Sequence, residues 1–473
     1  MMSRRAAVVV VAGALLAVVA LVVGSLVRPG RDAPAPSPSP SASPSTSEPS
    51  APPVVLAAAT PEPVDPSAPA VADVLGPVAA DPRLGGRVGV AVVDLSSGAL
   101  AYRLEDGRGQ TPASTLKVLT AVAVLQAVGP QTRFSTRAVL TPDGGTVVLV
   151  GGGDPLLTAD PDPSGVPEPT PLPDLATVTA DALRAAGAGP VRVAVDDRFF
   201  SGPAVDPDWE PGYVGAGVVS PVSALAVDGG RASPRAVGRS PDPAVAAGQA
   251  FARLLATSGV AVEGGVERVP VPRGSSQLGV VRSAPLDSVV EYVLATSDND
   301  AAEVLGRHAA FVTGRPASES GASEALTAVL AGLGLDVTGA ELRDASGLAR
   351  GSSVPPRLLA DALALAASPD HPRLRSAVTG LPVAGFTGTL DSRFDDEAAL
   401  AGAGGVRAKT GTLTGVGSLA GVVTAETGTT YAFAVLADAV PPGGTAGARE
   451  ALDAVAATLS ACGCAPAAAR GGP

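Results

Sequence analysis

Strand-like segments occur near both ends of this chain, and helix-like segments lie between them. Residues 87–106 alternate in hydropathy and turn at Ser96–Gly98, which predicts a β-hairpin. Three more strands are expected in "VRAKTGTL", "GSLAGVVTAET" and "TTYAFAVLADAV", followed by a closing helix over residues 446–461. A sheet that takes strands from both chain ends predicts an α/β domain whose intervening residues include an insertion.

The segments between these strands divide into two kinds. Residues 114–129 predict a helix that begins near Ser114 and ends near Gly129, and residues 284–380 are mainly helical. Between them, short β-like runs and Pro-rich connections alternate with helices near 174–186 and 243–258. We therefore expect one domain formed by residues 73–134 and 281–465, with residues 135–280 as an inserted subdomain.

The N-terminal region has a different composition from the rest. Arg4 and Arg5 precede residues 6–27, a run of 22 residues without charge. A membrane span needs about 20 apolar residues, so residues 1–28 predict an uncleaved anchor, with a cleaved signal as the alternative. Residues 29–72 form a Pro/Ser-rich linker with too little apolar content to fold. An anchor followed by a spacer places the remaining chain outside the cytoplasmic membrane.

Charge and rare residues exclude several classes of function. The net charge is −12 and no basic stretch is interleaved with aromatics, so nucleic acid is not an expected partner. We expect His308 and His371, the two histidines, to be structural, and no G-x-S-x-G motif supports an α/β-hydrolase. Cys462 and Cys464 are expected to pair in an oxidising envelope. A C-x-C metal site is the alternative, but no cluster of metal ligands accompanies it.

Lysine usage points to a chemical role. Only Lys117 and Lys409 are lysines, whereas the other 31 basic residues (33 − 2) are arginines. Lys117 follows Ser114 by three residues, so the two side chains share one helix face. A serine becomes a good nucleophile when a neighbouring base takes its proton. Lysine can lose its own proton and act as that base, whereas arginine cannot.

Two further motifs support this interpretation. Asn299, the only asparagine, lies in "TSDND" together with Ser297, and Lys409 begins the Lys-Thr-Gly of "AKTGTLTG". The chain therefore contains Ser-x-x-Lys, Ser-Asp-Asn and Lys-Thr-Gly in that order. This trio is typical of penicillin-binding proteins and class A β-lactamases.

The chain resembles the penicillin-binding protein 4-type D-alanyl-D-alanine carboxypeptidase/endopeptidase family over about residues 75–462. The narrower resemblance depends on the 183 residues (297 − 114) between Ser114 and Ser297, and on phrases such as "GGGDPLL", "DASGLAR" and "LPVAGFTGTL". It implies a β-lactamase/transpeptidase-like fold, in which helices flank a five-stranded antiparallel sheet that carries an inserted subdomain. The insertion is shorter than usual, mostly in residues 229–245, so its inner subdomain is expected to be reduced or absent. Ala345 replaces the usual Gly.

The resemblance also implies roles for the motif residues. Ser114 would attack the penultimate D-Ala carbonyl of a peptidoglycan stem peptide, with Lys117 as base. Ser297 would pass a proton to the leaving D-Ala, and Asn299 would hold the substrate amide. The backbone N–H groups of Ser114 and Thr412 would form the oxyanion hole. The substrate carboxylate would be bound by the Lys-Thr-Gly strand, residues Lys409, Thr410, Gly411 and Thr412, and Lys409 would help lower the pKa of Lys117.

No metal or cofactor is implied, and β-lactams would act as inhibitors that acylate Ser114. Two alternatives remain: a β-lactamase, and a non-catalytic wall-binding protein with the same fold. The class A β-lactamases need a Glu-x-x-x-Asn element, and this element cannot be present because Asn299 is the only asparagine. The sequence does not predict the balance of carboxypeptidase and endopeptidase action, the stem-peptide preference or the oligomeric state.

Overall fold

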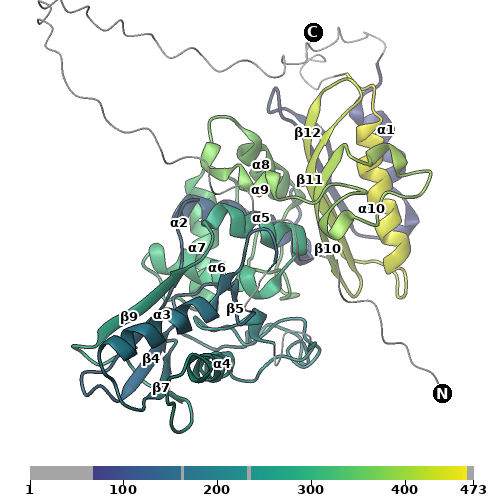
Figure 1. The fold of residues 1–473 in the computed structure, drawn as a ribbon. Helices are drawn as coiled ribbons and strands as arrows, with labels where there is room; N and C mark the ends of the chain where they lie inside the picture. The colour runs from purple at the N-terminus through teal and green to yellow at the C-terminus, as the bar shows by residue number, and fades with distance from the viewer. Residues whose placement is uncertain (1–67, 161–163, 232–235, 466–473) are drawn as a thin grey trace, which may run out of the picture. The chain divides into compact units, whose positions relative to one another are not determined.

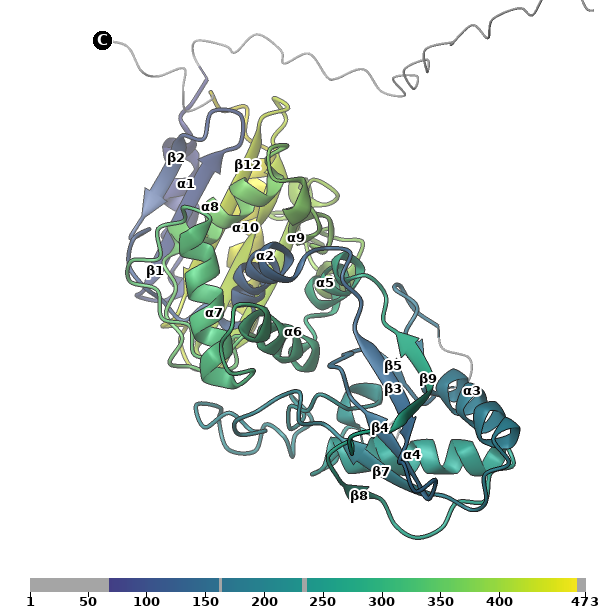
Figure 2. The ribbon, with the colours of Figure 1, turned by 90° about the vertical axis from the view of Figure 1, so that its left-hand side faces the viewer.

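The computed structural model describes residues 68–160, 164–231 and 236–465. Its main sheet is five-stranded and antiparallel, with the strand order β10-β11-β12-β1-β2 (Figures 1 and 2). The strands come from both ends of the chain, which confirms the predicted fold class. They are β1 (Val88–Asp94), β2 (Leu100–Leu104), β10 (Val406–Leu413), β11 (Val416–Thr424) and β12 (Thr430–Ala437).

Helices cover both faces of this sheet. Helices α1 (Val71–Ala79) and α10 (Thr445–Ser460) pack on one face, and α8 (Pro356–Ala367) packs on the other (Figure 2). Successive side chains of a strand point to opposite faces. Val90 and Val92 therefore belong to the apolar cluster under α1 and α10, whereas Ala91 and Val93 belong to the cluster on the α8 side. Because both faces are covered, the three central strands β1, β11 and β12 read as nearly continuous apolar runs.

Helix α2 (Leu116–Val128) lies at the centre of the helical layer. Ten consecutive residues, 116–125, are buried. Because α2 is surrounded by other helices, it is apolar on all sides apart from Lys117, Thr120 and, in its last turn, Gln126. The surrounding helices are α5 (Leu286–Thr296), α6 (Asn299–Val312), α7 (Glu319–Gly332), α8 and α9 (Ser376–Thr379).

A second sheet lies between α2 and α5 in the sequence, with the strand order β8-β7-β4-β3-β9. Helices α3 (Leu172–Ala185) and α4 (Pro243–Thr257) cover one face through an apolar cluster that includes Ala138, Leu149 and Val193. The strands are β3 (Ser135–Leu140), β4 (Thr146–Val150), β7 (Arg192–Asp196), β8 (Glu267–Arg268) and β9 (Ser276–Arg282). A separate pair, β5 (Leu157–Thr158) and β6 (Thr170–Pro171), completes the strands.

Several local expectations differ from the structure. Helix α1 begins at Val71, inside the segment assigned to the linker, because a short helix containing Pro77 beside a Pro-rich tract gives little periodic signal. Ser114 lies in the 3-10 turn η2 (Ala113–Thr115) and not inside the α-helix that follows. Residues 333–355 contain neither helix nor strand and interrupt the helical region expected over 284–380.

The remaining expectations about organisation are mostly not tested. Between η3 (Asp228–Gly230) and α4, the described residues contain only the isolated bridge Arg231–Arg239, and the reduction or absence of an inner subdomain stays a prediction. The division into domains also stays a prediction. Strand β9 continues two residues beyond residue 280, the predicted end of the inserted subdomain. Cys462 and Cys464 form a disulfide.

The expected membrane anchor, residues 6–27, lies outside the described residues. Within residues 68–160, 164–231 and 236–465, no helix has the length and apolarity that crossing a membrane requires. The same ranges contain no group of three or more His, Cys, Asp or Glu side chains placed to hold a metal ion.

Candidate active site

Ser114 is presented by a tight turn that packs against the main sheet. Ala113, directly before it, has a φ of 48°, in the left-handed region that few non-glycine residues adopt. A Cβ atom at Gly347 would lie 1.9 Å from the Ala113 carbonyl oxygen, so only glycine fits there. Ser418 of β11 donates a hydrogen bond to the carbonyl oxygen of Pro112 (2.6 Å). The turn is therefore fixed from two sides, and its backbone strain is sustained by these neighbours.

Lys117 is completely buried, and its amine reaches three oxygen atoms. Its Nζ lies 3.0 Å from Ser114 Oγ, 2.7 Å from Asn299 Oδ1 and 2.7 Å from the Ser346 carbonyl oxygen. A neutral amine has two N–H donors and one lone pair. It can therefore donate to the two carbonyl oxygens and accept the Ser114 hydroxyl proton, which leaves every group satisfied.

Burial shifts Lys117 toward that neutral form. Burial lowers the pKa of Lys117 to about 8, although Asp344 and Glu303 oppose the shift by attracting the charged amine. Burial also lowers the pKa of Lys409 well below its usual value, and repulsion from Lys117 adds to this. Burial is the cause that lowers the pKa of Lys117, and the expected contribution of Lys409 to this shift stays a prediction.

Ser297 and Asn299 lie where α5 meets α6. Ser297 ends α5 in the left-handed conformation (φ 60°), and Asp298 caps α6 by accepting the Ala301 N–H (2.9 Å). Asn299 Nδ2 donates to the Val218 carbonyl oxygen (2.9 Å), while Oδ1 accepts from Lys117. Each end of the amide keeps one further hydrogen-bonding position for a substrate. The Ser297 hydroxyl makes no hydrogen bond with a described residue.

Residues 409–412 form the part of β10 that lies beside Ser114. A Cβ atom at Gly411 would lie 3.1 Å from the Ser114 nitrogen, so the strand and the turn are in close approach. Lys409 is completely buried and donates to the Thr410 carbonyl oxygen (2.8 Å), and Thr410 donates to Thr389 (3.0 Å). Thr412 pairs with Gly417 of β11 and has a half-buried side chain. The structure thus brings the three motifs together, although no direct hydrogen bond links Ser297, Thr410 or Thr412 to Ser114.

With this geometry established, comparison with known proteins identifies the family. The D-Ala-D-Ala carboxypeptidase 3 (S13) family matches residues 71–240 and 235–460. The chain belongs to this family. The prediction of a serine-type D-alanyl-D-alanine carboxypeptidase is confirmed.

The relatives of this S13 chain span nearly its whole length. It is 39% identical to the carboxypeptidase Rv3627c of Mycobacterium tuberculosis over 478 residues, covering 98% of each chain. It is 37% identical to the carboxypeptidase DacB of Mycolicibacterium smegmatis, covering 88% of this chain and 90% of that protein. Its fold is similar to penicillin-binding protein 4 from Haemophilus influenzae, with a TM-score of 0.67 and 22% identity over 81% of this chain and 97% of that one.

In this S13 carboxypeptidase, a loop of residues 344–349 supports Lys117 from behind. Asp344 is buried and accepts hydrogen bonds from the Gly347 and Ala349 N–H groups, both at 2.8 Å. Glu303, also buried, accepts the Ala345 N–H (3.2 Å), and burial together with the charge of Asp344 raises the pKa of Glu303 to about 8. These bonds fix the loop that offers the Ser346 carbonyl oxygen to Lys117.

The inserted residues also contact the site, which the sequence did not reveal. Trp209, the only tryptophan, donates its indole N–H to Asp344 (3.1 Å). Arg307 of α6 donates to the carbonyl oxygens of Ser201 (2.6 Å) and Pro203 (2.8 Å). The Val218 carbonyl oxygen that orients Asn299 belongs to the same inserted segment. The only signals in the sequence were the single tryptophan and the "DASGLAR" phrase, and neither indicates a contact by itself.

His308 has a structural environment. Its ring stacks on Phe134 with centroids 3.8 Å apart, and its Nε2–H donates to the Gly153 carbonyl oxygen (2.8 Å). Burial lowers the pKa of His308 to about 4, so the ring is neutral at physiological pH. These contacts join α6 to the start of the inserted segment.

Proposed function

We propose that this S13 carboxypeptidase removes the terminal D-Ala from peptidoglycan stem peptides through an acyl-enzyme on Ser114. The observation that carries this proposal is the position of the Lys117 amine. It lies 3.0 Å from Ser114 Oγ and has two carbonyl acceptors for its own hydrogens. A buried neutral amine in this position is the general base that a serine nucleophile requires.

In the acylation step, Ser114 Oγ bonds to the carbonyl carbon of the penultimate D-Ala while its proton moves to Lys117 Nζ. The C–N bond to the terminal D-Ala then breaks. The leaving amine takes a proton through the Ser297 hydroxyl, which is free to turn toward it because it has no partner among the described residues. A water molecule then attacks the ester, and Ser114 regains its proton as the acid product leaves.

Two further roles follow from the strand beside Ser114. The close approach of Gly411 to the Ser114 nitrogen supports an oxyanion hole formed by the backbone N–H groups of Ser114 and Thr412. Lys409, Thr410 and Thr412 line the same strand and would bind the substrate carboxylate, since Lys409 has no acidic partner among the described residues. Asn299 would use its remaining donor and acceptor positions to hold the substrate amide.

We place the enzyme in the cell envelope, outside the cytoplasmic membrane, because its stem-peptide substrates are there. Residues 6–27 are long and apolar enough to anchor it. β-Lactams would acylate Ser114 in place of the stem peptide. In support, the Haemophilus influenzae relative of this fold has been crystallised in complex with a β-lactam.

The test is labelling with a fluorescent penicillin together with D-Ala release from a soluble stem pentapeptide. Ser114→Ala should abolish both signals. The control is Ser201→Ala, which changes an exposed serine whose side chain has no described partner, and it should label and turn over like the wild type. Persistent labelling of Ser114→Ala would refute the assignment of the nucleophile.

A further inference from the structure

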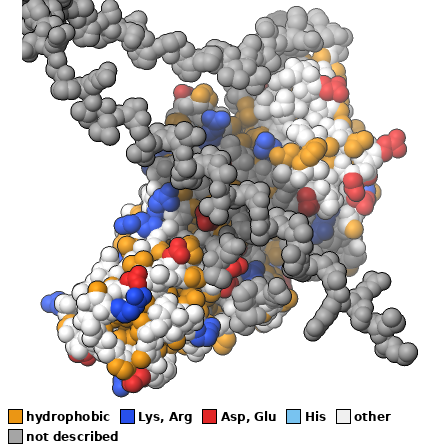
Figure 3. All heavy atoms as spheres, in the orientation of Figure 1, with side chains coloured by type: hydrophobic (Ala, Val, Ile, Leu, Met, Phe, Trp, Pro, Cys, Tyr) orange, Lys and Arg blue, Asp and Glu red, His pale blue; other side chains and the backbone are white. Residues whose placement is uncertain are grey.

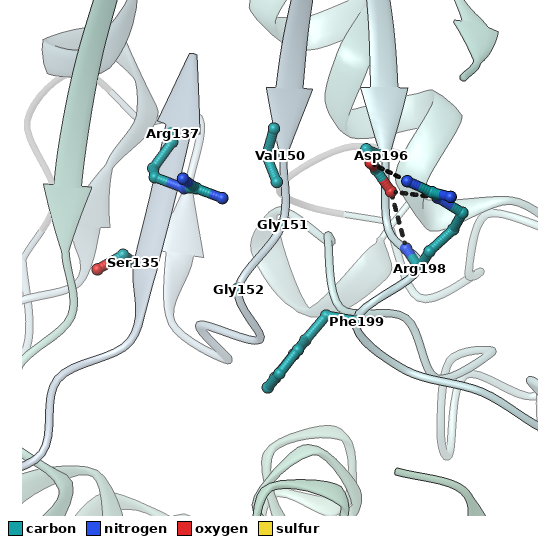
Figure 4. A pocket seen from close by; sticks show the side chains of 8 residues that line it. All are labelled: Ser135, Arg137, Val150, Gly151, Gly152, Asp196, Arg198 and Phe199. Carbon is teal, nitrogen blue, oxygen red and sulfur yellow. Dashed lines mark hydrogen bonds and ion pairs between the residues drawn. The ribbon is translucent and has the colours of Figure 1, made fainter. Parts of the chain in front are cut away.

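A second pocket lies on the inserted sheet, on the face opposite α3 and α4. It has a volume of about 470 Å³, and its lining includes Arg137, Val150, Asp196, Arg198 and Phe199. Figure 4 shows the Arg137 and Arg198 side chains on the two sides of Val150, with the Phe199 ring at the lower edge. None of these residues belongs to the three catalytic motifs.

Strand register explains why these side chains meet. Arg137 of β3 lies opposite Val150 of β4, which lies opposite Asp196 of β7. Residues directly opposite each other in neighbouring strands project to the same face. Arg282 of β9 does not line the pocket, but it lies opposite the lining residue Ser135 and therefore shares this face of the sheet.

The pocket has an excess of positive charge. Asp196 is the only acidic side chain among its lining residues, and it is already paired with Arg198 (2.9 Å). Arg137 and Arg282 are exposed and have no ion pair or side-chain hydrogen bond with any described residue. This excess contrasts with the net charge of −12 for the whole chain. On the surface shown in Figure 3, acidic and basic side chains are by comparison interspersed.

The pocket also has an apolar edge and a further donor. The Phe199 ring packs edge-on against Phe311 of α6, with centroids 4.8 Å apart, and Phe311 is 55% exposed. Gly152 lines the pocket, and its N–H has no acceptor among the described residues. A guanidinium group binds a carboxylate through paired N–H donors. The arginines, the Gly152 N–H and the apolar Phe199 edge together therefore suit a carboxylate attached to an apolar segment of a peptide.

Helix α6 connects the edge of the pocket to the active site. Phe199 contacts His308, which follows Asn299 by nine residues (308 − 299) on α6. Nine residues of helix span about 14 Å. An extended peptide covers that distance with about four residues.

We propose that this pocket binds the carboxylate of a second peptidoglycan stem peptide while another stem occupies Ser114. The proposal rests on the function proposed above. Peptidoglycan presents many identical stems close together, so a second site would raise the effective concentration of substrate at Ser114. Soluble single stems would gain nothing from it.

The test separates binding at this pocket from catalysis. Wild-type enzyme is first acylated with penicillin, which blocks Ser114, and is then sedimented with purified peptidoglycan freed of phosphate-containing polymers. We expect the acylated enzyme to cosediment, Arg137→Gln to bind about tenfold more weakly, and amidation of the peptidoglycan carboxylates to abolish binding. The matched control is Arg192→Gln, since Arg192 is an exposed arginine on β7 of the same sheet.

The outcomes are distinct. D-Ala release from a soluble pentapeptide should be unchanged in Arg137→Gln, whereas the KM for insoluble peptidoglycan should rise about tenfold. The pocket proposal is overturned if the acylated enzyme does not sediment, if Arg137→Gln binds like Arg192→Gln, or if amidation has no effect. Binding restored only by phosphate-containing polymers would also overturn it. Failure of the proposed function would instead appear as wild-type enzyme that releases no D-Ala.

Discussion

At the residue scale, catalysis depends on whether one buried amine carries a proton. Lys117 has no acidic hydrogen-bond partner, and its two carbonyl acceptors are matched to the neutral form. Asp344 and Glu303 lie behind it and attract the charged form. The pKa of the amine is therefore about 8. A general base is most effective when its pKa lies close to the pH at which the enzyme works.

The rate of penicillin acylation should therefore depend on pH in a defined direction. A base with a lowered pKa is protonated at acid pH, so the rate should rise with pH and level off above about pH 8. Lys117→Arg keeps the positive charge but cannot lose its proton, so its rate should lie on the order of 10³-fold below the wild-type plateau and should not rise through pH 8. Stopped-flow measurement of acylation from pH 6 to pH 10 checks both statements. A flat profile for the wild type would contradict the role of Lys117 as base.

At the element scale, α6 and the 344–349 loop fit each other closely. A Cβ atom at Gly306 would lie 2.7 Å from the Ala345 methyl group and 3.3 Å from the Ala322 methyl group. The loop carries Ala345 at this point, and the absence of a side chain at Gly306 of α6 leaves room for its methyl group. Since this loop presents the Ser346 carbonyl oxygen to Lys117, the fit bears on catalysis as well as on stability.

Gly306→Ala should destabilise the protein even though alanine is the better helix former. The change gains about 1 kcal/mol of helix propensity, while overpacking costs about 1–3 kcal/mol, so we expect a net loss of about 1 kcal/mol. Adding Ala345→Gly should restore most of the lost stability, because the methyl group introduced at position 306 then has room. Urea unfolding of the two single variants and the double variant measures this coupling.

Gly332→Ala provides the matched control. Gly332 also lies in a helix, α7, but nothing lies within 4 Å of a Cβ atom built there. That variant should be neutral or slightly stabilising. Additive effects of Gly306→Ala and Ala345→Gly would show that the two positions do not compete for space.

The element scale also shows what could be predicted from the sequence. The strands of the main sheet and the three motifs have local signatures, so β10, α2 and the α5–α6 junction could be placed in advance. Trp209, Glu303 and the Val218 carbonyl oxygen could not, because their roles arise from contacts between segments far apart in the chain. The same holds for Arg137, whose importance depends on strand register. Helix α1 was missed since its short apolar pattern is interrupted by Pro77.

At the scale of the whole molecule, all motif residues lie between Ser114 and Thr412, within the described part of the chain. A chain beginning at Ala68 should therefore label with penicillin as fast as the full-length protein and remain in the soluble fraction. The full-length protein should sediment with membranes if residues 6–27 form an uncleaved anchor. N-terminal sequencing of the full-length product checks this, and a soluble product that begins after residue 28 would contradict the anchor.

The pairing of β1 with β12 joins the first strand of the main sheet to the last, with Val88 opposite Ala437. Ser114 and Lys409 come from the two halves that this pairing brings together. The chain is synthesised from its N-terminal end, so Ser114 is made long before Lys409 is. A chain that stops before β12 lacks the central strand of the sheet, which pairs with both β11 and β1. Chains truncated in this way should therefore be inactive toward stem peptides.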